Sequence, residues 1–346
     1  MLPGGAMRTT NLVLFEGLPG SGKSTSGQRL ALHLDGLGVP ARWWHEEHPG
    51  HPLYPFGDQA TLGRFLADLE SAAQGAVIAG VLDRWRGVAA GLARAGEVAV
   101  LDGCLFVYAT LCLYRADAPA AVITAYLDRV AQAIAPARPC VVYFVQPDVA
   151  AALRRICDER GPELEAYWIG GVERSRRGRR LGLRGFAGLV AFWTAHRELA
   201  DAAFRRLPFP TLVLDPTAQP RSAGAAAVVD FLGLPPDEEV PLPPAEAARF
   251  TGRYVRRGAA GEERCAVAAE AGRLYVEGLP GIWPRARLLP ARRPAGAAAA
   301  PASPVTFHVA SWPIRVAFAT DERGGVSTLT AGDHRWGRSD RTFVRA

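Results

Sequence analysis

Apolar runs of strand length alternate with longer segments of helical spacing along the first 215 residues of the chain. The strand-like runs cover residues 11–16, 41–45, 98–102, 140–146 and 211–215. Apolar positions three or four residues apart predict helices over 24–36, 62–96, 119–135 and 148–160. Short strands separated by helices predict an α/β fold, a five-stranded parallel sheet with helices on both faces.

The pattern changes after residue 215. A last helix is expected over 222–232, and five prolines then follow at positions 235, 236, 241, 243 and 244. Proline lacks a backbone N–H, so this segment is expected to be a linker. Strict alternation of apolar and polar residues takes over beyond it and predicts a small antiparallel β-barrel or sandwich. The predicted domains are residues 1–233 and 249–346, joined by a linker over 234–248.

Composition and charge add only broad limits. The 346 residues suit two domains, and the formal net charge is +6. This charge fits either an acidic partner such as nucleic acid or an arginine-rich composition with a few phosphate-binding arginines, and we favour the second. The five cysteines form no CxxC pair, which indicates free thiols in a reducing cytoplasm. Because the chain has neither a signal-peptide pattern nor an apolar run of ~18 residues, we expect a cytoplasmic protein without membrane contact.

The stretch GLPGSGKST at residues 17–25 carries the strongest chemical signal. It matches the pattern G-x4-G-K-S, and it lies between a predicted strand and a predicted helix. Glycines let successive backbone N–H groups point at phosphate oxygens, and the following helix presents its positive N-terminus to the same anion. The predicted nucleotide-binding residues are Gly17, Leu18, Pro19, Gly20, Ser21, Gly22, Lys23, Ser24 and Thr25, with Arg154 from a later helix.

Lysine usage supports this interpretation. The chain has 40 lysines and arginines, and Lys23 is its only lysine, which leaves 40 − 1 = 39 arginines. A compact ammonium fits inside a tight ring of backbone, whereas a planar guanidinium does not. We therefore expect Lys23 to reach the β- and γ-phosphates of a nucleotide.

The third predicted strand, EVAVLDG, ends in Asp102. A carboxylate after this strand is placed to hold Mg²⁺ directly or through water, together with the hydroxyl of Ser24. The alternative is an aspartate that only caps the next turn. We favour the metal role for Ser24 and Asp102 because the order of the elements agrees with it.

Polar and aromatic residues follow the second predicted strand, in WWHEEHPGHP. A carboxylate here is placed to orient or deprotonate an acceptor hydroxyl. Neighbouring strand residues point to opposite faces, so only one of Glu46 and Glu47 is expected to face the site, and we select Glu47. A solvated acidic loop is the alternative. The nearby histidines lack the acidic or cysteine partners of a metal site.

Arginines follow the fourth predicted strand. The helix over 148–160 ends in Arg160, and six more arginines lie between Arg174 and Arg184. Arginines beside a bound triphosphate would neutralise the charge that builds up on the transferred phosphoryl group. Arg160 or the arginines at 174–180 are expected to do this. A nucleic-acid patch ranks second because interleaved aromatic residues are missing, and a solvated helix face is the simple alternative.

Taken together, residues 11–232 resemble the P-loop kinase superfamily of nucleoside, nucleotide, shikimate-type and antibiotic kinases. The resemblance rests on LVLFEGLPGSGKST, LDGCLF and FVQPD, which also resemble a group of poorly characterised actinobacterial P-loop proteins. It implies the sheet order 2-3-1-4-5 and the use of ATP with Mg²⁺. The sequence has Asp-Gly-Cys at 102–104, where nucleoside kinases have Asp/Glu-Arg-Ser, and this departure counts against a nucleoside acceptor.

The C-terminal segment is similar to the lipocalin-like β domains that follow some serine beta-lactamase-type hydrolases. Phe250, Gly252 and Tyr254 carry this resemblance. A Ser-x-x-Lys nucleophile needs a second lysine, so the segment is not expected to be a hydrolase itself.

The motifs together predict a Mg²⁺·ATP-dependent phosphotransferase acting on a hydroxyl of a small molecule such as a nucleoside, a sugar or an antibiotic. The expected catalytic residues are Lys23, Glu47, Asp102 and Arg160. One alternative is a P-loop ATPase or nucleotide switch whose β domain binds a partner, and another is an RNA-end kinase that uses the arginine-rich segment. The residues leave the acceptor and the oligomeric state open.

Overall fold

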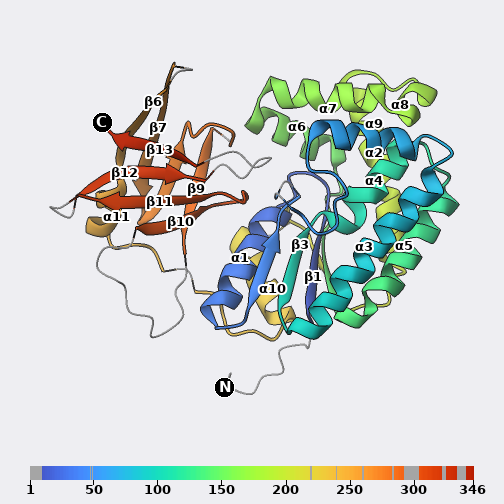
Figure 1. Ribbon diagram of the computed structural model, residues 1–346, viewed down its shortest axis with the longest axis horizontal. Coiled ribbons are helices and arrows are strands. Elements are labelled where there is room, and N and C mark those ends of the chain that lie inside the picture. The colour runs from blue at the N-terminus through green and yellow to red at the C-terminus, as the bar shows by residue number, and fades with distance from the viewer. Residues whose placement is uncertain are drawn as a thin grey trace. The chain divides into compact units, whose positions relative to one another are not determined.

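The computed structural model describes residues 10–46, 48, 50–218, 220–238, 240–258, 261–282, 284–291, 304–321, 325–332 and 340–346. The chain divides into two compact units, whose main parts are Gly50–Asp237 and Glu238–Ala346. The first unit contains a parallel sheet with helices, and the second contains an antiparallel barrel (Figure 1).

Five parallel strands form the sheet of the first unit. Their order is β2-β3-β1-β4-β5, which confirms the predicted fold class and strand order. The central strand β1 pairs with β3 on one side, where Phe15 lies opposite Asp102, and with β4 on the other. Every residue of β1, β3 and β4 is buried, as expected for a sheet that is covered on both faces. The strands are β1 (Leu12–Gly17), β2 (Ala41–Trp44), β3 (Val98–Asp102), β4 (Pro139–Phe144) and β5 (Thr211–Leu214).

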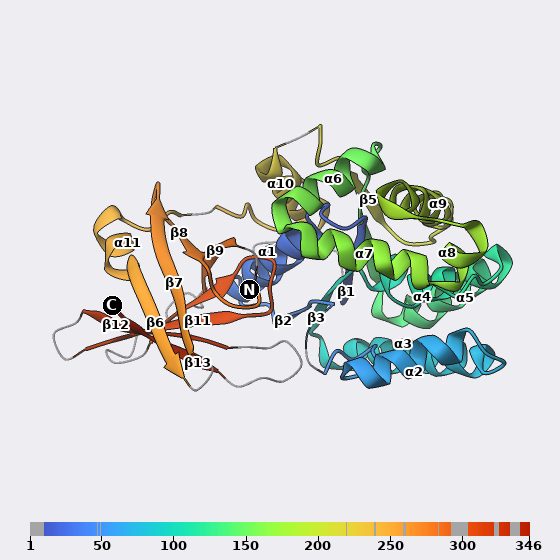
Figure 2. The same cartoon turned by 90° about the horizontal axis from the view of Figure 1, so that it is seen from above.

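Helices cover both faces of this sheet. Figure 1 shows α1 and α10 on one side of β1 and β3, and α3 and α5 on the other. Figure 2 shows α2 and α3 lying side by side. The first helices are α1 (Lys23–Gly36), α2 (Gln59–Leu69), α3 (Gln74–Ala95), the π-helical turn η1 (Cys104–Tyr108), α4 (Ala109–Arg115), α5 (Ala120–Ile134), the 3-10 turn η2 (Ala135–Ala137) and α6 (Val149–Arg160).

The helix predicted over 62–96 is two helices, α2 and α3. The Ser71 hydroxyl donates to the Asp68 carbonyl at 2.9 Å and accepts from the Ala73 backbone N–H at 3.0 Å. Such local side-chain bonds compete with the helical backbone ladder, which explains the interruption between Leu69 and Gln74. Asp58 begins α2 by accepting from the Thr61 N–H at 2.7 Å.

Three further helices lie between α6 and β5, where the sequence predicted only an arginine-rich segment. Pro162 begins the first of them at a position that tolerates the missing N–H of proline. These helices are α7 (Pro162–Arg174), α8 (Arg176–Leu181) and α9 (Gly185–Phe204), and α10 (Arg221–Phe231) follows β5. No helix in the described part of the chain is both long and apolar enough to span a bilayer.

The second unit is a closed antiparallel barrel. The sequence predicted either a barrel or a sandwich. The strands of the barrel follow the order β10-β11-β12-β13-β6-β7-β8-β9. They are β6 (Gly252–Gly258), β7 (Gly261–Glu270), β8 (Arg273–Glu277), β9 (Arg285–Pro290), β10 (Val305–Val309), β11 (Arg315–Thr320), β12 (Val326–Ala331) and β13 (Arg341–Arg345).

A short helix, α11 (Pro244–Phe250), precedes the barrel and contributes Phe250 to its core. The Phe250 ring lies 5.2 Å from Phe307 and 5.0 Å from Phe318, centroid to centroid, and its carbonyl accepts from the Tyr254 hydroxyl at 2.7 Å. The linker was expected to extend to residue 248, but the chain is helical from Pro244 because proline is accepted in a first helical turn.

Candidate nucleotide-binding site

The segment between β1 and α1 forms a tight loop whose glycines have positive φ angles. Gly17, Gly20 and Gly22 have φ values of 139°, 74° and 98°. A Cβ atom at Gly17 would lie 2.6 Å from the Phe144 carbonyl oxygen, so the loop passes too close to β4 for any side chain at this position. The Ser21 N–H donates to the Leu18 carbonyl at 3.3 Å and closes the turn. The glycine spacing in the sequence is therefore required by backbone conformation.

Lys23 is the first residue of α1, and its side chain turns back into this loop. Its ammonium donates to the Leu18 carbonyl at 2.9 Å, and the residue is only 8% exposed. Among the described residues, the Ser21 hydroxyl is buried without a hydrogen-bond partner. An ammonium and an unsatisfied hydroxyl at the N-terminus of a helix suit an anionic ligand.

Asp102 ends β3 beside the loop. It is 2% exposed, and the Ser24 hydroxyl hydrogen-bonds to its carboxylate. Burial raises the pKa of Asp102 to about 7, while the charge of Lys23 acts in the opposite direction. Its Oδ2 atom has no hydrogen-bond partner within the described part of the chain. A buried carboxylate oxygen without a partner is costly, and its position beside Ser24 fits a cation ligand.

The structure places Glu46 next to these residues. A Cβ atom at Gly103 would lie 3.5 Å from Lys23 Cε and 3.7 Å from Glu46 Oε2, so both side chains flank the turn after Asp102. The negative charge of Glu46 also contributes to the raised pKa of Asp102. Glu47, which the sequence analysis selected, lies outside the described residues. Its neighbour Glu46 is therefore the carboxylate that can be assigned to this position.

Glu16, the residue before Gly17, is a site residue to which the sequence analysis assigned no role. It is fully buried, and its carboxylate accepts from the backbone N–H groups of Leu105 at 2.6 Å and Phe106 at 3.1 Å. Burial raises its pKa to about 7, although both hydrogen bonds and Lys23 lower it. A glutamate at the end of an otherwise apolar strand was the signal in the sequence. Lys23 therefore has three carboxylates around it, those of Glu16, Asp102 and Glu46, and this excess of negative charge favours a further cation.

The helix α6 covers the loop at residues 17–25, which is predicted to bind phosphate and is called the phosphate loop below, from another side. Its Ile156 lies so close to the loop that a Cβ atom at Gly20 would be 2.9 Å from Ile156 Cδ1. Arg160 is one helical turn further along and therefore lies on the same face of α6 as Ile156. Arg154, predicted to bind the nucleotide, pairs with Glu165 at 3.1 Å and lies 3.7 Å from the centre of the Phe186 ring. Arg154 thus joins α6 to α7 and α9 in this structure.

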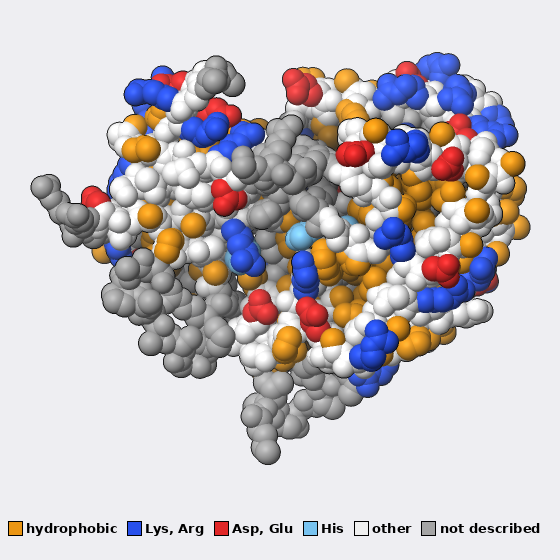
Figure 3. Space-filling model, viewed as in Figure 1, with side chains coloured by type: hydrophobic (Ala, Val, Ile, Leu, Met, Phe, Trp, Pro, Cys, Tyr) orange, Lys and Arg blue, Asp and Glu red, His pale blue; other side chains and the backbone are white. Residues whose placement is uncertain are grey.

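The six-arginine segment is folded into α7, α8 and the connection to α9. Figure 3 shows Lys and Arg side chains gathered where Figure 1 places α7 and α8. Arg177 and Arg180 both pair with Asp117, and Arg179 lies 3.6 Å from Glu70. These ion pairs hold three of the arginines against α2 and the connection between α4 and α5. Of the predicted arginines, Arg160 is the one that helical geometry places on the face toward the phosphate loop.

Aromatic side chains pack beside Asp102 and Glu46. The His51 ring stacks on Tyr54 with centroids 4.1 Å apart, and Tyr54 lies 4.4 Å from Tyr108. The sulfur of Cys104 is 3.5 Å from His51 Nε2, and burial raises the pKa of this thiol well above its usual range. Across the described residues, no group of three or more His, Cys, Asp or Glu side chains is arranged to hold a metal by itself.

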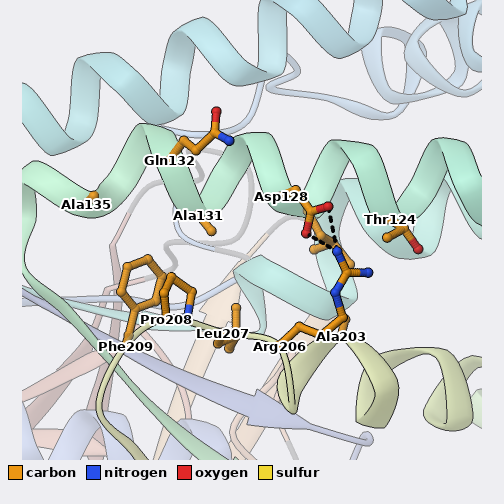
Figure 4. A pocket seen from close by; sticks show the side chains of 11 residues that line it. Thr124, Asp128, Ala131, Gln132, Ala135, Ala203, Arg206, Leu207, Pro208 and Phe209 are labelled. Atoms are coloured by element: carbon orange, nitrogen blue, oxygen red, sulfur yellow. Dashed lines mark hydrogen bonds and ion pairs between the residues drawn. The ribbon is translucent and has the colours of Figure 1, made fainter.

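One hollow of this unit lies away from the candidate site. It has a volume of about 420 Å³ and is lined by α5, α9 and the residues after α9. Figure 4 shows Arg206 and Asp128 joined within it, at 2.8 and 2.9 Å. None of the residues predicted from the sequence lines this hollow. The candidate site therefore rests on the side chains around the phosphate loop.

The sequence matches no protein-family model, and a search of curated proteins gives no match.

Proposed function

We propose that the sheet unit is a Mg²⁺·ATP-dependent phosphotransferase that moves the γ-phosphoryl group to a hydroxyl of a small molecule. The observation that carries this proposal is the buried Asp102 carboxylate, which has one oxygen bonded by Ser24 and one without a partner, beside Lys23 in the phosphate loop. Such a group has little structural purpose, because an apolar residue would avoid the cost of burying it.

Ser24 and Asp102 would hold the magnesium ion. Two protein ligands are enough, because Mg²⁺ usually keeps several waters and takes further oxygens from substrate phosphates. When bound, the ion would neutralise charge on the β- and γ-phosphates. Lys23 and the N–H groups of the phosphate loop would bind the same phosphates and align them for in-line transfer.

A carboxylate after β2 would receive the acceptor proton. In the transfer, the acceptor oxygen bonds to the γ-phosphorus while the bond from that phosphorus to the bridging oxygen breaks, and ADP leaves. The hydroxyl proton passes to the carboxylate. Glu46 is our candidate because its carboxylate lies near Gly103, as does the Lys23 side chain, and Glu47 stays a candidate from the sequence. Arg160 is proposed to stabilise negative charge from the α6 side.

The acceptor is proposed to lie near the aromatic cluster of His51, Tyr54 and Tyr108. His51 stacks on Tyr54, and Tyr54 packs against Tyr108 at a tilt of 38°, so the cluster would provide a rigid wall near Asp102 and Glu46. A nucleoside, a sugar or an antibiotic-like alcohol could meet such a wall. The five free cysteines agree with a proposed cytoplasmic location, where ATP is available.

A transfer screen tests this function. Radiolabelled ATP with MgCl₂ would be incubated with the full chain and with nucleosides, sugars, aminoglycosides and nucleoside antibiotics. We expect a labelled product that disappears in Lys23→Ala and in Asp102→Asn but persists in Asp83→Asn, an exposed carboxylate on α3.

Other results of this screen would point to the alternatives. ATP hydrolysis without any labelled acceptor would favour the ATPase or nucleotide switch. Label on RNA ends would favour the RNA-end kinase, whose RNA binding must also be strongest at low salt. Unchanged turnover in Lys23→Ala would refute the phosphate-loop assignment itself.

A further inference from the structure

The turn that follows Asp102 is held by Phe15 and Glu16, near the end of β1. The Gly103 N–H donates to the Phe15 carbonyl at 2.9 Å. One residue further along β1, the two carboxylate oxygens of Glu16 accept separately from Leu105 and Phe106, at 2.6 and 3.1 Å. These N–H groups lie in the first turn of a helical segment, where no helical carbonyl is available to them.

The carbonyl groups of the same two residues are also held by buried side chains. The Thr110 hydroxyl donates to the Leu105 carbonyl at 2.6 Å, and the His196 ring donates to the Phe106 carbonyl. Thr110 is fully buried and His196 is 2% exposed. The backbone N–H and C=O groups of both residues are therefore fixed from β1, α4 and α9 together.

Burying Glu16 carries an energetic cost that needs a reason. It lies on the same face of β1 as Leu12 and Leu14, which belong to the hydrophobic core. An apolar side chain would avoid the desolvation of a carboxylate but would leave two buried N–H groups without acceptors. A glutamate at position 16 therefore packs less favourably in the core than an apolar residue would, but it fixes the position of η1.

We propose that Glu16 is a positioning residue, whose bidentate hydrogen bonds to Leu105 and Phe106 hold the Asp102 carboxylate in the geometry that binds magnesium. The inference rests on the proposed function. The reasoning is that of an outer coordination shell, in which groups that never touch the metal orient those that do. On the side of this turn, the other restraints on Asp102 are the Gly103–Phe15 hydrogen bond and the Cys104 thiol, which lies 3.4 Å from the Asp102 carbonyl oxygen. Gly103 itself has a φ of 66° and no side chain to pack.

The variant Glu16→Gln tests this role with minimal change in shape. The amide oxygen can accept from one of the two N–H groups, while the amide NH₂ faces the other and cannot accept from it. The measurement is binding of a fluorescent non-hydrolysable ATP analogue, mant-AMPPNP, as MgCl₂ is titrated. We expect Glu16→Gln to need on the order of 10-fold more magnesium for half-maximal binding, with unchanged affinity in EDTA. Hydrogen exchange at the Leu105 and Phe106 amides should also become faster.

Glu97→Gln is the matched control. Glu97 lies just before the N-terminal end of β3, whereas Asp102 is the last residue of that strand. The chemical change, a glutamate replaced by glutamine, is the same. Its magnesium requirement should equal that of the wild type. A wild-type magnesium requirement in Glu16→Gln would overturn the inference.

A second variant covers the case in which Glu16→Gln does not fold. Thr110→Val keeps the side-chain shape and removes only the hydrogen bond to the Leu105 carbonyl. We expect its magnesium requirement to rise by about 5-fold, and an unchanged value would then overturn the inference. Absence of analogue binding in the wild type would instead refute the proposed function, so the two failures are distinct.

Discussion

The ammonium of Lys23 lies 2.9 Å from the carbonyl oxygen of Leu18, inside the loop that connects β1 to α1. This contact explains why the one lysine of the chain stands here. The backbone around the ammonium encloses a space that fits this small, tetrahedral group. A ligand phosphate would take over part of the hydrogen bonding that Leu18 now provides.

The variant Lys23→Arg should therefore fail although it keeps the charge. The planar guanidinium is too large for a residue that is 8% exposed, so it would either displace the loop or turn outward. We expect at least a ~10-fold loss of ATP-analogue affinity, measured by calorimetric titration, and a loss of about 1–3 kcal/mol in the free energy of unfolding. Wild-type affinity in Lys23→Arg would show that the loop is wider than this structure has it.

Two glycines of the loop should differ sharply in their tolerance of alanine. A Cβ atom at Gly17 would lie 2.6 Å from a backbone oxygen of β4, whereas one at Gly22 would have nothing within 4 Å. Both positions have positive φ, so both variants carry strain of about 1–3 kcal/mol. We expect Gly17→Ala to be less stable than Gly22→Ala by a further ~2 kcal/mol in chemical denaturation. Equal stability would contradict the close approach of the loop to β4.

Stability should depend on pH through His196. Burial lowers the pKa of His196 from 6.5 to about 4, so the unfolded chain binds the proton more readily below pH 6.5. Stability from this group is therefore complete at pH 7.5 and is lost as the pH falls toward 4. Relative to the non-titrating variant His196→Phe, the wild type should lose about 2 kcal/mol of its free energy of unfolding between pH 7.5 and 5. A difference between the two proteins that is constant with pH would contradict the buried, neutral state of this ring.

The barrel should depend on Phe250, which α11 contributes to its core. Phe250 is 1% exposed and contacts two other phenylalanine rings, so Phe250→Ala should cost about 3–5 kcal/mol in the free energy of unfolding. Val344→Ala, at a site that is 59% exposed, should change stability by less than about 0.5 kcal/mol. ATP-analogue binding of the folded protein should not change in either variant, since no phosphate-loop residue belongs to the barrel. Loss of binding in folded Phe250→Ala would contradict this separation.

The pattern of apolar and polar residues predicted the fold well where burial alone sets that pattern. The apolar runs located all five parallel strands, and alternation located the barrel, because burial on both faces or on one face sets the pattern directly. The boundary between α2 and α3 was missed, since Ser71 interrupts a helical pattern through side-chain bonds that periodicity does not record. The helices α7 to α9 were not predicted. Only α8 is rich in arginine, whereas α7 and α9 contain one arginine each.

The sequence by itself predicted a phosphate-binding loop at residues 17–25, since its glycines, Lys23 and Ser24 are close together in the chain and the loop conformation requires glycines at these positions. Only the tertiary structure decided which distant side chains join that loop. Glu46 reaches the turn after Asp102, Glu16 holds that turn from β1, and Arg177 and Arg180 pair with Asp117. The physical reason is that a charged side chain takes the partner that folding brings within a few ångströms, and strand pairing and helix packing set that distance.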